Sequence, residues 1–204
     1  MAIRAVVFDI GGVLEVTPPT GCQDRWAAKL GLRWSEIETR LNDGVIKAGS
    51  LGRASLEEVE HRTAELLGLS EVETTEFMED MWTEYLGTLN VELARYFASL
   101  RPRFRTGIVS NSFVGARERE RGAYNFEVLC DLIVYSHEEG VSKPDPRIYE
   151  IALERLDIDP SEAVFLDDQH VAVEGARSVG MSSNLYLDND QAIRDLQACL
   201  NPGP

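Results

Sequence analysis

Residues 5–14 read AVVFDIGGVL, an apolar run that ends at the carboxylate of Asp9 and continues into two glycines. A run that is apolar throughout, rather than alternating with polar residues, is typical of a strand buried on both faces of a parallel sheet. Gly11 and Gly12 permit a tight turn and let backbone N–H groups approach an anion closely. The stretch predicts a central strand with Asp9 at its carboxyl end, as a nucleophile, a metal ligand or a plain turn residue.

Further apolar runs along the chain repeat this pattern, with helical stretches between them. The expected strands are 5–10, 105–109, 132–135, 163–166 and 183–187, and the expected helices are 93–100, 114–121, 146–156, 171–179 and 190–200. Strands that alternate with helices indicate βαβ units, so we predict an α/β fold with a doubly wound parallel sheet. Ligands of such sheets bind at the carboxyl ends of the strands.

Residues 16–88 show a different sequence pattern and contain no good strand. The pattern Ser-x-x-Glu, in which the two side chains cap a helix start reciprocally, begins at Ser35, Ser55 and Ser70. Glycines stand where helices should stop, at Gly31, Gly44 and Gly68. We therefore predict a core domain formed by 1–15 and 89–204, with a helical insert of about four short helices over 16–88.

The composition excludes several classes of protein. The chain has 204 residues, 44% of them hydrophobic, and its net charge is −15, a field that repels nucleic acid and anionic lipid. Cys22, Cys130 and Cys199 are far apart and form no C-x-x-C pattern, so we expect neither a disulfide framework nor a zinc site. No apolar stretch is long enough to span a membrane. These features predict a cytoplasmic protein without nucleic-acid or membrane partners and leave its oligomeric state open.

Polar side chains follow the other predicted strands. Ser110 and Asn111 come after 105–109, Lys143 lies in GVSKPDPRIY, and Asp167 with Asp168 follows 163–166. Individually these residues suit a turn, a solvated lysine and a solvated acid pair at a helix start. Their chemical interpretation is a phosphoryl-binding hydroxyl and amide, a fixed cation, and oxygen ligands for Mg²⁺.

Together, the order Asp, Ser, Lys, Asp-Asp at successive strand ends resembles the haloacid dehalogenase (HAD) superfamily of hydrolases. The segments FDIGGVL, IVSNS, VSKPDPRIY and VFLDDQHVAVEGARSVGM are similar to its first, second, third and fourth motifs, and the resemblance covers about residues 3–200. The insert resembles the helical cap that the family places after its first motif. The last two motifs also resemble those of the phosphatase domain of soluble epoxide hydrolases and of sugar-1-phosphate phosphatases.

The resemblance implies a Rossmann-like core and a Mg²⁺-dependent phosphatase that acts on a small phosphorylated metabolite through an aspartyl-phosphate. Asp9 would be the nucleophile, oriented by Lys143. The implied Mg²⁺ ligands are Asp9, the carbonyl of Gly11, Asp168 and, through water, Asp167. The implied phosphate-binding residues are Ser110, Asn111, Lys143, Gly11 and Gly12.

Two positions depart from the family pattern. Gly11 stands where most of these phosphatases carry a second aspartate as general acid and base, a role worth about 10²–10⁴-fold in rate. Its absence predicts a substrate with a good leaving group: an anomeric sugar phosphate, an acyl phosphate, an anhydride or an aryl phosphate. Alternatively, His170 or Glu15 donates the proton, although a surface position and a cap hinge are their simpler roles. Ala172 stands where relatives often carry Asn or Asp, which predicts weaker Mg²⁺ binding.

Other functions stay open at this point. A metal-independent haloacid dehalogenase also uses an aspartate nucleophile, but its halide site has no use for the pair Asp167 and Asp168. A catalytically weak phospho-ligand-binding protein would explain Gly11. A mutase would need the acid/base that Gly11 removes.

Overall fold

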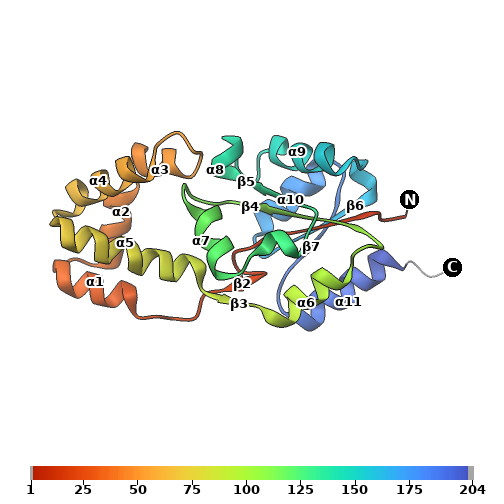
Figure 1. Ribbon diagram of the computed structural model, residues 1–204, viewed down its shortest axis with the longest axis horizontal. Helices are drawn as coiled ribbons and strands as arrows, with labels where there is room; N and C mark the ends of the chain where they lie inside the picture. Colours follow the sequence, from red (N-terminus) through yellow and green to blue (C-terminus); the bar gives the residue numbers. More distant parts are fainter. Residues whose placement is uncertain (1, 202–204) are drawn as a thin grey trace.

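The computed structural model describes residues 2–201, which form an α/β core beside a group of helices (Figure 1). The core sheet consists of β1 (Ala5–Phe8), β4 (Arg105–Ser110), β5 (Leu132–Tyr135), β6 (Ala163–Asp167) and β7 (Ser182–Leu185). The core helices are α6 (Val91–Ser99), α7 (Ala116–Ala123), α8 (Ser136–Glu139), α9 (Pro146–Leu156), α10 (His170–Ser178) and α11 (Asn189–Leu200), with short 3₁₀ turns at Phe126–Val128 and Pro160–Glu162. The predicted α/β fold with a doubly wound parallel sheet is confirmed.

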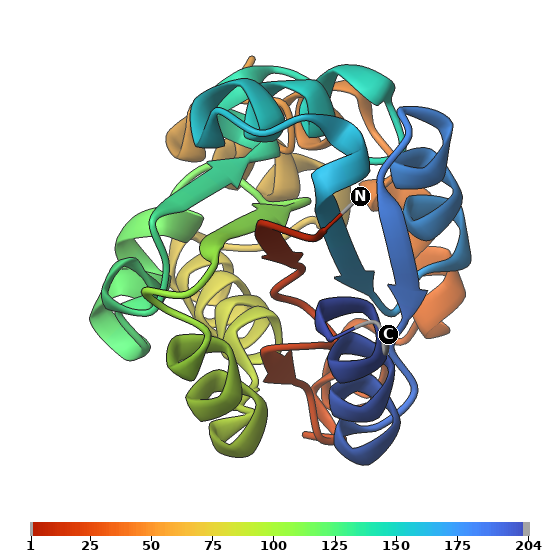
Figure 2. The same ribbon diagram turned by 90° about the vertical axis from the view of Figure 1, so that its right-hand side faces the viewer.

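The sheet has the strand order β5-β4-β1-β6-β7, and all neighbouring strands are parallel (Figure 2). The chain adds β4 and β5 on one side of β1 and then β6 and β7 on the other. The order therefore reverses at β1, and the carboxyl ends of β4, β1 and β6 lie next to one another. This is the edge at which doubly wound sheets bind ligands.

Both faces of the sheet are buried, which explains the unbroken apolar runs. Val6 and Phe8 pack with α6 and α11 on one face, while Ala5 and Val7 pack with α9 and α10 on the other. Side chains of a strand alternate between its two faces, so burial on both sides requires apolar residues at every position. This burial fixes the register of β1 and places Asp9 directly after its carboxyl end.

The helical insert, which we call the cap, consists of α1 (Cys22–Leu30), α2 (Trp34–Leu41), α3 (Gly44–Gly49), α4 (Leu56–Leu67) and α5 (Glu71–Leu86). It has its own apolar cluster around Trp26, Ile37 and Phe77. Short strands β2 (Glu15–Val16) and β3 (Thr88–Leu89) pair antiparallel where the chain leaves and re-enters the core. The sequence predicted no strand between 16 and 88, and the two-residue ladder was missed because it is too short to carry a pattern.

The predicted caps are partly right. Ser55 and Ser70 form capping boxes, and Gly31 and Gly68 end their helices in the left-handed conformation. The box at Ser35 is wrong, because the N-cap of α2 is Arg33, two residues earlier, and the helix that begins at Trp34 aligns Trp34, Ile37 and Leu41 toward the cap cluster. Gly44 begins α3 behind the N-cap Asp43 instead of ending a helix.

Within the described residues no helix is long and apolar enough to cross a membrane.

Candidate active site

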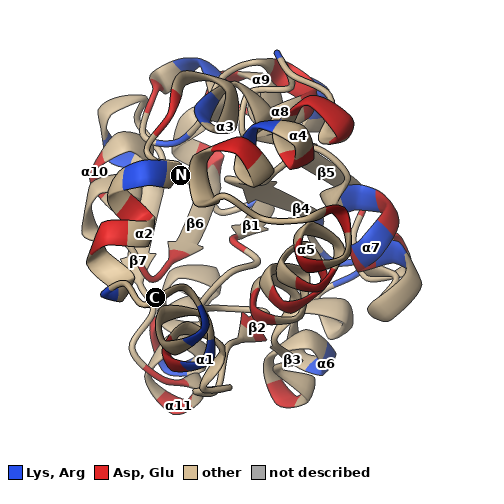
Figure 3. Cartoon of the chain, turned by 90° about the vertical axis from the view of Figure 1, so that its left-hand side faces the viewer, with Lys and Arg blue, Asp and Glu red and all other residues tan. Residues whose placement is uncertain are grey.

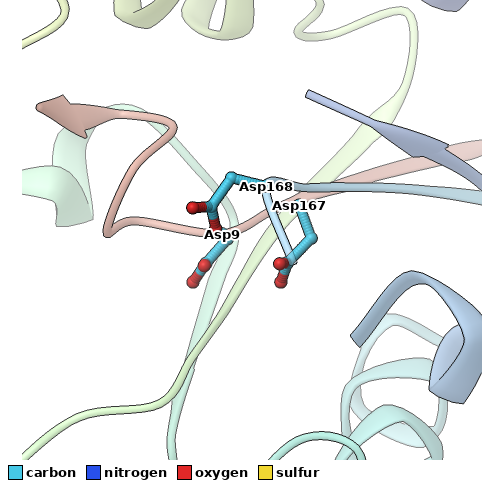
Figure 4. A group of neighbouring side chains, drawn as sticks. All are labelled: Asp9, Asp167 and Asp168. Atoms are coloured by element: carbon cyan, nitrogen blue, oxygen red, sulfur yellow. The ribbon is translucent and has the colours of Figure 1, made fainter. Parts of the chain in front are cut away.

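Three carboxylates converge at the carboxyl edge of the sheet. Asp9 follows β1 directly, Asp167 is the last residue of β6, and Asp168 comes next. One oxygen of each lies within 4.8 Å of the others. Figure 4 shows the three side chains gathered at the ends of their strands. The backbone N–H of Asp9 donates to the carbonyl of Leu166 at 2.9 Å, which continues the ladder between β1 and β6 to the site itself. Neighbouring parallel strands thus bring together residues that are far apart in the sequence.

Lys143 lies between two of these carboxylates. Its Nζ is 2.7 Å from Oδ1 of Asp9 and 2.6 Å from Oδ2 of Asp167, and the side chain is buried. The side chain of Asn111 fixes the lysine backbone: Nδ2 of Asn111 donates to the carbonyl of Lys143 at 3.0 Å, and the lysine N–H donates to Oδ1 of Asn111 at 2.7 Å. The position of the ammonium group is therefore determined by the loop that follows β4.

The charges at the site do not balance. Burial raises the pKa of Asp9 to about 7; Lys143 opposes this rise and Asp167 adds to it. Burial lowers the pKa of Lys143, but the attraction of Asp9 and Asp167 outweighs it, so the net shift is upward. Among the described residues, one buried ammonium group accompanies these three carboxylates, and it contacts Asp9 and Asp167. Clustered carboxylate oxygens with excess negative charge suit a hard divalent cation such as Mg²⁺, so the residues fit the ion that the motifs imply.

The glycines after β1 bring the backbone close to these carboxylates. Gly12 has φ +74°, and a Cβ built there would lie 2.5 Å from Oδ2 of Asp168. A side chain at this position would strain the backbone and displace the carboxylate of Asp168. Gly11 faces more open space: the nearest atom to a Cβ built there is Oε2 of Glu15, at 4.0 Å.

Glu15 is a buried carboxyl group beside this turn. Oγ1 of Thr17 donates a hydrogen bond of 2.8 Å to its Oε1, and only 4% of the residue is exposed. Burial raises the pKa of Glu15 to about 7; the hydrogen bond from Thr17 opposes this rise, and Glu120, Asp9 and Asp168 add to it. His170, the other alternative donor, is exposed at the start of α10.

Ser110 ends β4 and is buried, next to Asn111. Ala172 is buried in α10, where its carbonyl accepts a hydrogen bond of 2.7 Å from the hydroxyl of Tyr149. Sequence reasoning missed Gln169, whose Nε2 donates to Oδ2 of Asp168 at 2.8 Å and whose N–H donates to Oδ1 of Asp167 at 2.7 Å. Gln169 thus holds the acid pair, the kind of role that the sequence left vacant at Ala172. Its place directly after the two aspartates was the available signal.

Curated proteins of similar sequence include both full-length and partial matches. The chain is 28% identical over 218 residues to bifunctional epoxide hydrolase 2 of Sus scrofa, a match that covers 97% of this chain but 39% of that protein. It is 29% identical over 216 residues to phosphatase MT3486 of Mycobacterium tuberculosis, covering 97% of this chain and 95% of that one. The chain thus spans about two fifths of the length of the epoxide hydrolase.

Solved structures share the fold. A HAD family enzyme of Bacteroides thetaiotaomicron, determined in complex with magnesium and inorganic phosphate, superposes with a TM-score of 0.80 at 21% identity, covering 94% of this chain and 99% of that one. The sequence model of the haloacid dehalogenase-like hydrolase family matches residues 3–180 of this chain. With the motifs, the fold and this match in agreement, the chain belongs to the haloacid dehalogenase-like hydrolase family.

Proposed function

We propose that this chain is a Mg²⁺-dependent phosphatase that acts on a small phosphorylated metabolite through an aspartyl-phosphate at Asp9. The observation that carries the proposal is the buried contact of Lys143 with Asp9 and Asp167, with Asp168 alongside. A haloacid dehalogenase of this fold needs no such excess of carboxylate. The similarity to phosphatase MT3486, and to a HAD family enzyme that was solved with magnesium and phosphate, supports the same reaction class.

Each residue has a chemical role in this proposal. Asp9, the carbonyl of Gly11 and Asp168 would hold Mg²⁺, with Asp167 joined through water; the bound ion would offset the charge of the phosphoryl group. A carboxylate oxygen of Asp9 attacks phosphorus, the bond to the ester oxygen breaks, and water later hydrolyses the aspartyl-phosphate. Lys143 orients Asp9. We assign the remaining phosphoryl contacts to Gly12, to the hydroxyl of Ser110 at the end of β4, and to the backbone N–H of Asn111. Positioned donors of this kind account for most of the catalysis of phosphoryl transfer.

The decisive test combines a substrate panel with acid-to-amide variants. With Mg²⁺, the chain should release phosphate from at least one phosphorylated metabolite, and chelation should abolish the release. Asp9→Asn should lower kcat by about 10³-fold or more, because the amide is no nucleophile, whereas Asp190→Asn, on an exposed acid of α11, should change nothing. Halide release that survives chelation would instead establish a dehalogenase. Failure to turn over any substrate, with Asp9→Asn silent, would establish a binding protein.

Because Gly11 provides no general acid, we also propose that the enzyme prefers substrates with good leaving groups. Without an acid at this position, rates should follow leaving-group acidity, and acyl, anomeric or aryl phosphates should exceed alkyl phosphates. Gly11→Asp should then raise kcat/KM for alkyl phosphates by more than for acyl phosphates. Equal effects on both classes would contradict this preference.

The alternative to unaided departure of the leaving group is proton donation by Glu15, because its Oε2 is the nearest atom to the place that an aspartate at Gly11 would occupy. Glu15→Gln distinguishes these two hypotheses. If Glu15 donates the proton, the variant should lose about 10²-fold on alkyl phosphates and little on acyl phosphates. If the leaving group departs unaided, both substrates should react as they do with the parent chain.

A further inference from the structure

A cavity of about 410 Å³ lies between the cap and the core. Asn111, Ser112 and Phe113 line it from the loop after β4, and Ser136 lines it from the start of α8. The cavity therefore begins one residue beyond Ser110, at the loop to which we assign phosphate binding. Its volume lies in the usual range for sites that enclose a small ligand.

The walls of this cavity are apolar. Cap helices α2, α3 and α5 contribute Leu41, Ile46, Phe77, Met81 and Trp82, and the core contributes Phe113. Among the described residues that line it, none is charged, although the whole chain carries a net charge of −15. The space next to the phosphate site thus differs sharply from the rest of the surface, where Asp, Glu, Lys and Arg are spread over the cap helices (Figure 3).

Three of the polar side chains that line the cavity are hydrogen-bonded to protein groups, whereas the indole N–H of Trp82 has no partner among the described residues. The hydroxyl of Tyr85 donates to Oε1 of Glu120 at 3.0 Å, and Oγ of Ser136 donates to the carbonyl of Ser50 at 2.9 Å. Oγ of Ser112 lies 2.6 Å from Nδ1 of His137. A sugar placed here would exchange the water around its hydroxyls for the few remaining polar groups of the lining, those of Trp82, Thr63 and Ser142, which opposes binding.

We propose that this cavity binds the organic group of the substrate and that this group is apolar. The inference rests on the proposed phosphatase activity, and it narrows the substrate to a phosphate ester whose organic part is a hydrocarbon-substituted group rather than a sugar. An aryl phosphate with an apolar substituent meets both demands, since its phenolate is a good leaving group and its ring and substituent suit walls of Phe, Met and Trp. Selectivity comes from the walls, while Asp9 and its neighbours handle any phosphoryl group.

The test compares two aryl phosphates that differ in polarity but not in leaving-group acidity. One is para-butylphenyl phosphate, and the other has hydroxyls on the outer carbons of the same chain. Each methylene moved from water into the cavity is worth about fourfold in kcat/KM, so the butyl compound should exceed its hydroxylated partner by at least about tenfold. Equal kcat/KM values would overturn the proposal.

Variants of the walls connect this preference to the cavity. Met81→Gln, which keeps the length of the side chain, and Ile46→Thr should each reduce the preference for the butyl compound by about threefold or more. Leu187→Gln alters an exposed residue outside the cavity and should leave the preference unchanged. A loss that is the same for both aryl phosphates would contradict a selective role of these walls.

Two further probes separate this inference from the proposed function. Acetyl phosphate carries almost no organic group, so its hydrolysis with Mg²⁺ tests the phosphatase alone. Para-butylphenol carries no phosphate, so its binding in a calorimeter, weakened by Met81→Gln, tests the cavity alone. Turnover of acetyl phosphate without binding of the phenol would refute the cavity proposal and leave the phosphatase intact. Binding of the phenol without any turnover would refute the phosphatase proposal and leave the affinity of the cavity for an apolar group intact.

Discussion

Individual residues at the strand ends define the candidate site. Asp9, Lys143 and the pair Asp167–Asp168 were predicted because each directly follows an apolar run or lies in a recognisable motif. The contact of Asn111 with Lys143 was not predictable, because it depends on where one side chain meets a backbone 32 residues away. Hydrogen bonds of this kind leave no periodic trace in a sequence.

Gly12 gives a prediction at this scale. A methyl group there would lie 2.5 Å from Oδ2 of Asp168, so Gly12→Ala should displace this implied Mg²⁺ ligand and lower kcat/KM by about 10²-fold, with a higher Mg²⁺ concentration needed for half-maximal activity. Gly21→Ala is the matched control, because Gly21 has a similar φ of +73° and nothing within 4 Å of the new methyl. An equal loss of kcat/KM in both variants would show that backbone strain, and not the contact with Asp168, causes the loss.

Helices and strands were predicted best where hydrophobic pattern and burial agree. The strands of the core and helices α9 and α10 fall within a residue or two of their expected bounds. The start of α2 was wrong because packing of Trp34 in the cap outweighs the local capping signal at Ser35. The four-residue helix α8 was missed because it is shorter than any useful period.

The turn between α3 and α4 joins the cap to the core. Besides the bond from Ser136 to the carbonyl of Ser50, the guanidinium of Arg53 donates to the carbonyl of Gly140 at 3.1 Å. Gly52, in the same turn, has φ +62° and lies so close to α8 that a Cβ would overlap the carbonyl oxygen of His137. This seam borders the apolar cavity.

Gly52→Ala should therefore separate the cap from the core locally. We expect kcat/KM to fall by about 10²-fold, since small misplacements of binding elements have effects of that size, while far-UV circular dichroism stays unchanged. Gly68→Ala, at a similar φ of +70° with nothing within 4 Å, should cost about 1 kcal/mol of stability and no activity. Full activity of Gly52→Ala would show that the seam is not needed for turnover.

At the scale of the whole molecule, a buried carboxyl group connects the two bodies. Glu120 in α7 accepts hydrogen bonds from Tyr85 of the cap helix α5 at 3.0 Å and from Tyr135 of the core strand β5 at 2.5 Å. Burial raises its pKa to about 7 from an ordinary value of 4.5, although both tyrosines oppose the rise. Other charged groups that act on Glu120 or respond to it are Arg117, Glu127 and Glu15.

This raised pKa makes stability depend on pH. The folded chain holds the proton of Glu120 more tightly than the unfolded chain does, so the contribution of Glu120 to the free energy of unfolding should fall as pH rises from about 4.5 to about 7, by about 3 kcal/mol. Glu120→Gln removes this contribution, so its stability relative to the parent chain should increase between pH 5 and pH 8 in urea unfolding. Glu118→Gln, on an exposed residue of the same helix, should follow the parent chain at both values. Parallel pH profiles for parent and Glu120→Gln would contradict the buried proton.

The division into a core of 1–15 and 89–204 and a cap of 16–88 stays a proposal, and the ladder of β2 and β3 gives it an evolutionary meaning. Glu15–Val16 pairs with Thr88–Leu89, so the excursion begins and ends at neighbouring points of the core. A segment whose two ends already meet can be lengthened, shortened or exchanged without moving the sheet, since closing the loop costs no more for one insert than for another of similar length. An insert attached in this way can be replaced during evolution. Related hydrolases could thereby acquire new substrates while the catalytic residues of the core are retained.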